Sequence, residues 1–366
     1  METEKAFFEP ALIACLSMSL IQWFEQNARV LPWRSTPKKK VSPYGIWVSE
    51  IMLQQTRVEA VKGYYKRFLR ALPNIQALAE VPEDRLLKLW EGLGYYSRAR
   101  NLQKAAKAVV EQYQGELPAD YKALKSLPGI GPYTAGAVAS LAFRIPVPAV
   151  DGNVLRVVSR ILDSHLDISQ PEVKGAVETM LSEVMSSGAA HDRPDLFNQA
   201  LMELGAVVCI PNGAPQCFLC PVREFCLGFQ QGTAEELPVK APKKPRRIEE
   251  RTVLLLRQGK KTALRKRPGK GLLAGMWELP NIEGLYSAGE LENCLHISKE
   301  SILSVKELGE ARHIFTHIQW EMQGFEVELA DNCTLEGFGD LVWEAPAVIR
   351  KNYPLPSALK AYNKFI

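Results

Sequence analysis

Two acidic residues far apart in the chain stand in local settings that suit acid–base chemistry. Glu50 lies in the apolar stretch Trp47-Val-Ser-Glu-Ile-Met-Leu53, and Asp151 lies in Val150-Asp-Gly-Asn153. Burial would raise the pKa of the Glu50 carboxyl group, so that it stays protonated near neutral pH and can act as a general acid. One protonated and one ionised carboxyl group can together hydrolyse a glycosidic bond through an oxocarbenium-like transition state.

Each acid has a plainer interpretation when it is taken alone. A lone glutamate in a helix is usually a surface residue, and an aspartate before Gly-Asn often only closes a turn. The hypothesis of a catalytic pair therefore depends on Glu50 and Asp151 together.

The segment Leu127-Pro-Gly-Ile-Gly131, followed by Pro132-Tyr-Thr-Ala135, predicts two helices joined by a tight turn. Gly129 and Gly131 permit the turn and let another backbone come close. The first N–H groups of a helix bind an anion without a positive side chain. A DNA phosphate fits this description.

Four of the seven cysteines are crowded into one segment, with the spacing Cys209-x7-Cys217-x2-Cys220-x5-Cys226. No export signal precedes them, so we expect a metal site in a reducing compartment rather than disulfides. Four thiolates suit a tetrahedral zinc or a [4Fe–4S] cluster, and the spacing alone leaves both open.

The chain has 366 residues, a net charge of +4 and a pI of about 8.6, which agrees with two domains and permits nucleic-acid binding. The apolar-rich stretch 11–24 is short, interrupted by polar residues and preceded by glutamates. It predicts an amphipathic helix rather than a signal peptide or a membrane span. We therefore expect a cytoplasmic protein without membrane contact.

The apolar periodicity changes along the chain. Helical spacing continues to about residue 232, whereas a basic, proline-rich stretch and then strand-like runs follow. The prediction is an all-α domain at 1–232, a linker at 233–250 and an α+β domain at 251–366. The clearest expected helices are Glu83–Trp90, Asn101–Gln114 and Pro171–Ser186, and the expected strands are Thr252–Leu256, Thr262–Lys266, Ile314–Trp320 and Gly324–Leu329.

Across residues 1–232 the motifs resemble those of helix-hairpin-helix DNA glycosylases, and specifically the MutY-type adenine DNA glycosylases. The resemblance implies a helix-hairpin-helix glycosylase domain with a four-cysteine loop. Besides the hairpin, the motifs that carry it are Leu31-Pro-Trp-Arg34, Ser49-Glu-Ile-Met-Leu-Gln-Gln-Thr56, Glu91-Gly-Leu-Gly-Tyr-Tyr-Ser-Arg98, Val150-Asp-Gly-Asn153 and Phe197-Asn-Gln-Ala-Leu201.

By this resemblance, Glu50 is the acid that assists departure of adenine, and Asp151 is the carboxylate that meets the sugar cation. Whether Asp151 attacks covalently or stabilises a free cation stays open. Tyr133 and Asn153 would orient or buffer the two acids. The further contacts implied are Arg34 and Gln199 to the flipped adenine, Gln55, Thr56, Leu93 and Tyr95 to the vacated stack and the opposite base, and Gly129 and Gly131 to a DNA phosphate.

Position 133 separates branches of this superfamily. Bifunctional relatives such as endonuclease III carry a lysine there, whose amine forms a Schiff base and leads to strand cleavage. Tyr133 cannot form an imine, and the nearest lysine in sequence, Lys125, precedes the turn. We expect base removal without strong strand cleavage.

The resemblance also favours a [4Fe–4S] cluster held by Cys209, Cys217, Cys220 and Cys226, although the first gap is seven residues where the family usually has six. Residues 251–366 resemble the family's Nudix-like domain through Arg265–Pro280. The Arg-Glu-x-x-Glu-Glu core of Nudix hydrolases is absent, so a magnesium ion would have too few oxygen ligands. We expect a catalytically silent domain that recognises the oxidised base.

The recognition loop of that domain would be Phe315-Thr-His317, where the family usually has Phe-Ser-His. Thr316 keeps the hydroxyl group and adds a methyl group. A metal at His313 and His317 is the less favoured interpretation, because no acidic residue lies close in sequence.

The expected function is removal of adenine mispaired with 8-oxoguanine or guanine in duplex DNA, by a monomer. Three alternatives remain: a glycosylase of the same fold that removes another base such as thymine, a non-catalytic DNA-damage sensor, and a Nudix hydrolase of free nucleotides. The paired acids argue against the second, and the missing carboxylates argue against the third.

Overall fold

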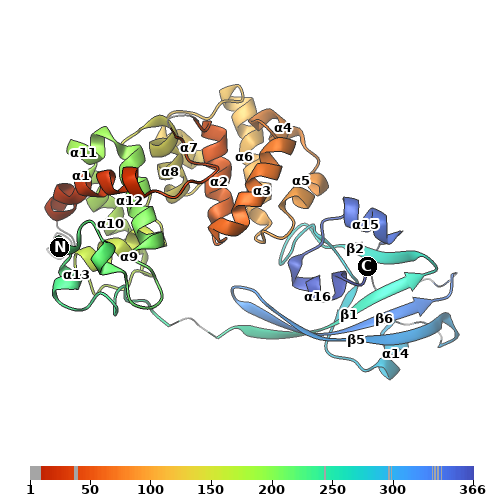
Figure 1. The fold of residues 1–366 in the computed structure, drawn as a ribbon. Coiled ribbons are helices and arrows are strands. Elements are labelled where there is room, and N and C mark those ends of the chain that lie inside the picture. Colours follow the sequence, from red (N-terminus) through yellow and green to blue (C-terminus); the bar gives the residue numbers. More distant parts are fainter. Residues whose placement is uncertain are drawn as a thin grey trace. The chain divides into compact units, whose positions relative to one another are not determined.

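The computed structural model describes residues 10–36, 40–242, 245–295, 297, 299–331, 333, 335, 338 and 340–366. The chain divides into two compact units. The first comprises residues 1–79 and 101–242, and the second comprises residues 80–100 and 243–366. Figure 1 follows the helices and strands of both along the sequence.

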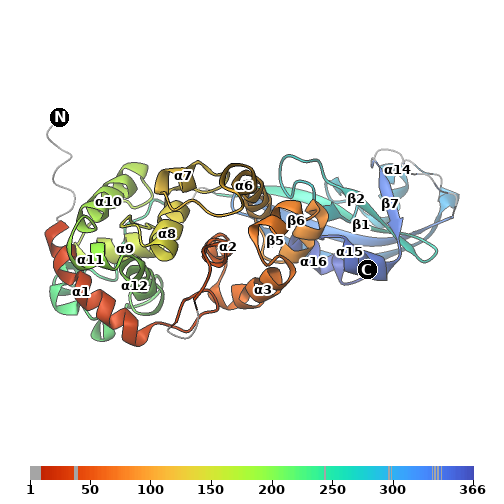
Figure 2. The same cartoon turned by 90° about the horizontal axis from the view of Figure 1, so that it is seen from above.

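Within its described residues the first unit contains helices and no strand, as the sequence predicts (Figure 2). Its helices are α1 (Pro10–Asn27), α2 (Pro43–Leu53), α3 (Val58–Ala71), α4 (Ile75–Glu80), α6 (Ser97–Tyr113), α7 (Tyr121–Ser126), α8 (Pro132–Phe143), α9 (Gly152–Ile161), α10 (Pro171–Val184), α11 (Gly188–Asp192), α12 (Pro194–Val207) and α13 (Leu227–Gln230), with 3₁₀ turns η1 (Cys217–Leu219) and η2 (Arg223–Phe225); α4 and α6 cross the boundary between the units.

One core of this unit is built by α1, α9, α10 and α12. In α9 the apolar residues Val154, Val157, Val158 and Ile161 recur at helical spacing and are all buried. This periodicity places them on one face, which packs against the other helices and drives the helix to form.

The predicted hairpin is confirmed by α7 and α8. The turn between them holds Gly129 at a φ of +74°, a left-handed conformation that favours glycine. Gly131 is the N-cap of α8 and Pro132 occupies its first turn, where the missing N–H costs no helical bond. The start of α8 is therefore sharply defined.

Helix α5 (Glu83–Trp90) has the bounds that the sequence predicts and belongs to the second unit. The Lys88 ammonium donates to the carbonyl oxygen of Tyr353 at 3.0 Å. The Glu91 carboxylate accepts a hydrogen bond from the backbone N–H of Leu355 at 2.8 Å. These contacts connect segment 80–100 with the C-terminal part of the chain.

In the described residues of the second unit, the strands form a seven-stranded sheet with central order β3-β2-β1-β6-β5, in which β4 also pairs with β1 and β7 with β2. Strands β1 and β6 are parallel and the other pairs are antiparallel. The strands are β1 (Arg247–Gln258), β2 (Lys261–Lys266), β3 (Trp277–Glu278), β4 (Asn281–Glu283), β5 (Ile302–Ile314), β6 (Ile318–Leu329) and β7 (Leu341–Glu344), and the helices are α14 (Leu291–Leu295), α15 (Pro346–Asn352) and α16 (Lys360–Asn363), with 3₁₀ turns at Ala288–Glu290, Lys299–Ser301 and Ser357–Leu359.

Both faces of the sheet are covered. Val253 and Leu255 of β1 face a core that includes residues of α15 and α16, whereas Leu254 and Leu256 face a core that includes residues of α14. Successive side chains of a strand point to opposite faces, so this continuous apolar run serves both cores. The α+β fold predicted for this region is confirmed.

The strands expected at 252–256, 262–266 and 324–329 lie within β1, β2 and β6. The expected single strand Ile314–Trp320 is wrong, because β5 ends at Ile314 and β6 begins at Ile318. A bond from the Phe315 N–H to the Ile318 carbonyl, 2.8 Å long, closes the turn between them. In the described parts of the chain, no helix has the length and apolar character needed to cross a membrane.

Candidate active site

A cavity of about 590 Å³ in the first unit collects most of the predicted site residues. It is lined by side chains from α2, α8, α12 and the start of α9, which are brought together from distant parts of the sequence. The predicted residues that line it are Arg34, Glu50, Gln55, Thr56, Tyr133, Asp151, Asn153 and Gln199.

Glu50 is buried on α2, with 5% of its surface exposed. Burial raises the pKa of its carboxyl group to about 7, and the nearby Asp151 adds to the rise, while the Tyr133 hydroxyl and Arg34 oppose it. The Tyr133 hydroxyl donates to Glu50 Oε2 at 2.6 Å. At neutral pH a large fraction of Glu50 therefore carries a proton that it can transfer.

Asp151 is the N-cap of α9, so its turn-forming role and its place in the cavity coexist. Its Oδ1 accepts from the backbone N–H groups of Asn153 and Val154, and its Oδ2 accepts from the Asn153 side chain at 2.8 Å. Burial raises the pKa of Asp151, but these hydrogen bonds act in the opposite direction. They favour the ionised form and hold the carboxylate in one orientation.

The side chain of Asn153 is in turn hydrogen-bonded to Arg156 of α9. The Arg156 Nη2 donates to Asn153 Oδ1 at 2.9 Å and to the Gly205 carbonyl at 2.7 Å. Its Nε donates to the carbonyl oxygen of Cys209 at 2.8 Å. Arg156 therefore joins the neighbour of Asp151 to α12 and to the first residue of the cysteine segment.

The cavity also contains Glu203, which the sequence motifs did not single out. Glu203 is 1% exposed and binds Arg29 at 2.7 Å and Arg34 at 2.6 Å. Burial alone would raise its pKa, but hydrogen bonds from the two arginines outweigh burial and lower it to about 2. A charged residue inside the otherwise apolar face of α12 was the available sequence signal.

A second residue that the sequence did not indicate is Lys174 of α10, which lines the same cavity. Its ammonium lies 3.7 Å from Glu178 on the same helix. It stands much further from Tyr133 in sequence than Lys125 does, so only the fold could reveal its position.

Three of the predicted lesion contacts, Leu93, Tyr95 and Thr316, belong to the second unit. Leu93 is buried, whereas 47% of the Tyr95 surface is exposed. Both Tyr95, with a φ of +48°, and Gln55 of the first unit, with a φ of +56°, have left-handed backbones that side-chain-bearing residues adopt rarely. Such strain often accompanies functional positions.

Thr316 lies at the exposed tip of the β5–β6 hairpin. Its hydroxyl is 3.1 Å from the hydroxyl of Tyr95, and both residues line a cavity of about 410 Å³. The hairpin backbone is held at the start of β1, because the Nε of Arg246 donates to the Phe315 carbonyl and the N–H of Arg247 donates to the His317 carbonyl, both at 3.1 Å.

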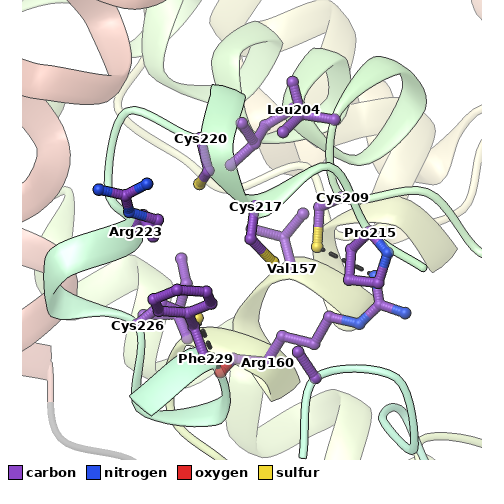
Figure 3. A pocket seen from close by; sticks show the side chains of 13 residues that line it. Val157, Arg160, Leu204, Cys209, Pro215, Cys217, Cys220, Arg223, Cys226 and Phe229 are labelled. Carbon is purple, nitrogen blue, oxygen red and sulfur yellow. Dashed lines mark hydrogen bonds between the residues drawn. The ribbon is translucent and has the colours of Figure 1, made fainter. Parts of the chain in front are cut away.

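The four clustered cysteines line one small pocket in the first unit (Figure 3). Arg160 Nη1 lies 3.3 Å from Cys209 Sγ, and Cys226 Sγ lies 3.2 Å from the Arg160 carbonyl. Burial raises the pKa of Cys220 to about 12 and that of Cys226 to about 11, so these thiols remain protonated at neutral pH unless a cation binds them.

Within the described ranges, no group of three or more His, Cys, Asp or Glu side chains is arranged to hold a metal ion. His313 and His317 are therefore not part of such a group. The cysteines nevertheless surround a common space, with Val157, Leu204 and Phe229 as apolar neighbours. Four thiolates are a donor set that suits either a tetrahedral zinc or a [4Fe–4S] cluster.

Comparison with known proteins agrees with both parts of the fold. Residues 48–183 match the HhH-GPD superfamily of base excision DNA repair proteins, and residues 252–364 match the NUDIX domain. A solved thermostable thymine-DNA glycosylase has a TM-score of 0.52 and 27% identity, covering 60% of this chain and 98% of that chain. The fold and the cavity thus define a helix-hairpin-helix base excision repair glycosylase with a Nudix-like C-terminal part.

Relatives that extend over both parts decide the family. The adenine DNA glycosylase of Rattus norvegicus is 34% identical and aligns with 92% of this chain and 76% of its own length. That of Schizosaccharomyces pombe is also 34% identical and aligns with 82% and 79%. The chain belongs to the adenine DNA glycosylases, DNA-repair enzymes that remove adenine from DNA.

Proposed function

We propose that this adenine DNA glycosylase acts on adenine paired with 8-oxoguanine or guanine, with Glu50 as general acid and Asp151 as the carboxylate facing the sugar. The observation that carries this proposal is the buried Glu50, whose pKa of about 7 lets it hold a proton beside Asp151. A glycosidase needs two acids with separated protonation states, and these two differ in their hydrogen-bond partners.

In the proposed reaction, Glu50 transfers its proton to a ring nitrogen of adenine, N7. The bond from the base to C1′ breaks and its electron pair leaves with neutral adenine. The positive charge that develops on the sugar is stabilised by the Asp151 carboxylate, which Asn153 orients. Water completes the hydrolysis, either directly or after a covalent adduct with Asp151.

The flipped adenine would lie against Arg34 and Gln199, which share the cavity with Glu50. Glu203 fixes the Arg34 guanidinium through a bond of 2.6 Å, so the arginine presents its donors in a set direction. A fixed direction matters because a base that rotates in the pocket would move N7 away from Glu50.

DNA contacts are proposed at the hairpin and at Gln55 and Tyr95, two of the residues with left-handed backbones. Gly129 and Gly131 would let a phosphate approach the first N–H groups of α8. Gln55 and Tyr95 would enter the stack and meet the base opposite adenine, which offsets part of the cost of flipping. The exposed hydroxyl of Thr316 would bind the oxidised base.

We further propose that strand cleavage is weak, because the residue beside Glu50 is a tyrosine. Lys174 is the alternative amine, since it lines the cavity. Borohydride trapping on abasic DNA distinguishes the two possibilities. Little covalent adduct is expected, and a strong adduct that disappears in Lys174→Ala would assign lyase chemistry to Lys174.

The cysteine pocket is proposed to hold a [4Fe–4S] cluster through Cys209, Cys217, Cys220 and Cys226. When bound, such a cluster would order the segment that carries it, and it takes no part in the proton transfers above. Anaerobically purified protein should be brown with about four irons per chain. Colourless protein with one zinc per chain would replace the cluster with a zinc module.

The substrate proposal is tested with end-labelled duplexes that contain A:8-oxoguanine, A:G, T:G or an oxidised pyrimidine, each scored before and after alkali. We expect excision from the first two only, with strand breaks that require alkali. Excision of thymine or of the oxidised pyrimidine, or no excision from A:8-oxoguanine and A:G, would contradict the proposed substrate.

A further inference from the structure

Asp151 lies at the end of a segment, residues 144–151, that is neither helix nor strand. Helix α8 ends at Phe143 and α9 begins at Gly152, so residues 144–151 make neither helical nor sheet hydrogen bonds along most of their length. Ala149 and Val150 are nonetheless fully buried. Buried backbone groups outside regular structure need other partners, and those partners determine where the segment lies.

Asn198 of α12 supplies two of these partners. It is 1% exposed, its Oδ1 accepts from the Ala149 N–H at 2.9 Å, and its Nδ2 donates to the Val147 carbonyl at 2.9 Å. The backbone needs an acceptor at one position and a donor at the other, and the side-chain amide of Asn198 offers both. Asn198 therefore bonds the chain on both sides of Pro148.

Helix α8 meets the same segment at Gly136. A Cβ atom added at Gly136 would lie 2.1 Å from the carbonyl oxygen of Pro148 and 3.0 Å from its carbonyl carbon. No real side chain tolerates such a contact, so glycine permits the approach. The same helix carries Tyr133 near its start, and Tyr133 binds Glu50.

We propose that Asn198 and Gly136 are positioning residues that together set the distance between the Asp151 carboxylate and Glu50. Neither touches the substrate. Gly136 fixes how closely α8, whose Tyr133 is bonded to Glu50 of α2, approaches the segment that ends at Asp151. Asn198 holds that segment against α12. A displacement of about 1 Å can lower a reaction rate about a hundredfold, so these contacts affect the chemical step directly.

This inference rests on the proposed role of Asp151, and the two can fail separately. If Asp151→Asn excises adenine at the normal rate, the proposed catalytic pair is wrong whatever Asn198 does. If Asp151→Asn is inactive but the Asn198 and Gly136 variants react normally, the pair stands and the positioning proposal is overturned.

The experiment uses full-length Asn198→Asp, Asn198→Ser and Gly136→Ala. The aspartate keeps an acceptor and loses the donor, the uncharged serine is too short to make both bonds, and the alanine pushes on Pro148. Matched controls are Leu201→Val, a buried truncation on the same helix as Asn198, and Gly175→Ala, a helical glycine with no atom within 4 Å of the added Cβ.

Single-turnover excision from an A:G duplex should fall about 10- to 100-fold in the three variants and stay near wild type in the controls. Affinity for a duplex with non-cleavable 2′-fluorinated adenosine should stay near wild type in all. A parallel loss of affinity and rate, or an equal loss of rate in controls of the same thermal stability, would overturn the proposal and leave a purely structural role.

A pH profile provides a readout that a structural role would not move. The ionisable groups that influence Glu50 are Tyr133 of α8, Asp151 before α9 and Arg34 after α1, and Asp151 acts to raise the pKa of Glu50. Moving Asp151 away weakens this effect. The alkaline limb of the rate profile should therefore shift to lower pH in Gly136→Ala, and an unchanged limb with a reduced rate would contradict displacement of Asp151.

Discussion

The Glu50 cavity of the first unit and the Thr316 hairpin of the second unit hold their polar groups in contrasting ways. Glu50, Asp151 and Glu203 are buried or nearly so and each has short hydrogen bonds from neighbouring elements. Thr316 is exposed, and its hydroxyl lies within hydrogen-bond distance of the hydroxyl of Tyr95, another exposed residue. Proton transfer requires fixed geometry and low solvation, whereas a reading contact can exchange its partner for the bound base.

The largest effect that follows from this contrast is expected in the cavity. Glu50→Gln preserves shape but cannot donate the acid proton, so excision should fall by about 10²- to 10⁴-fold. Asp151→Asn removes the charge that meets the sugar cation, so its excision rate should fall by a similar factor. Single-turnover assays and binding to uncleavable DNA measure both. Near-normal base release by Glu50→Gln would eliminate it as the acid.

The second prediction uses the pKa of Glu50, which is about 7. The protonated form is the reactive one, so the rate should be highest below pH 7 and decline as the pH rises through this value. The residual rate of Glu50→Gln should lack this limb. A wild-type rate that stays flat from pH 6 to pH 9 would be incompatible with Glu50 as the titrating acid.

The same burial carries a stability cost. The pKa of Glu50 rises from 4.5 to about 7 on folding, so between these values the folded protein retains a proton that the unfolded chain has lost. Stability should therefore decrease as the pH rises through this window. Glu50→Gln should recover on the order of 3 kcal/mol at pH 8 and little at pH 4.5, which urea unfolding at the two pH values measures.

A smaller effect is expected at the hairpin. Thr316→Ala removes one hydroxyl hydrogen bond to the oxidised base, worth on the order of 1 kcal/mol or about fivefold. The loss should appear with A:8-oxoguanine and not with A:G. The full chain should be used, because segment 80–100 clusters with the C-terminal part. Equal losses on both substrates would assign Thr316 to general affinity or stability.

The smallest effect separates orientation of the hairpin from charge. Arg246→Ala removes the side-chain bond to the Phe315 carbonyl, whereas Arg247→Ala removes the same charge but keeps the backbone bond to His317. Only Arg246→Ala should reduce the preference for A:8-oxoguanine, by about twofold. If both substitutions weaken binding to all duplexes alike, and the loss of affinity is larger at lower salt, the arginines act through phosphates instead.

The local elements of this protein could be predicted closely from its sequence. Helix Glu83–Trp90, the Gly129–Gly131 turn and the buried runs of β1 and β6 follow from periodicity and glycine placement. The strand expected at 314–320 failed because a three-residue hairpin loop of apolar and polar residues does not interrupt strand-like composition. Thr and His within the run have no turn signal as strong as Gly or Pro.

The sequence by itself determined which reactive groups the chain carries: two acids, a tyrosine in place of a lysine, a glycine-containing turn before a helix and four crowded cysteines. The tertiary structure decided their working states. The pKa of Glu50 depends on a tyrosine 83 positions away, Arg34 depends on Glu203, and the location of Asp151 depends on Asn198 and Gly136. Electrostatic and packing contacts act over a few ångströms in space, so partners far apart in the chain leave no local pattern and are known only once it has folded.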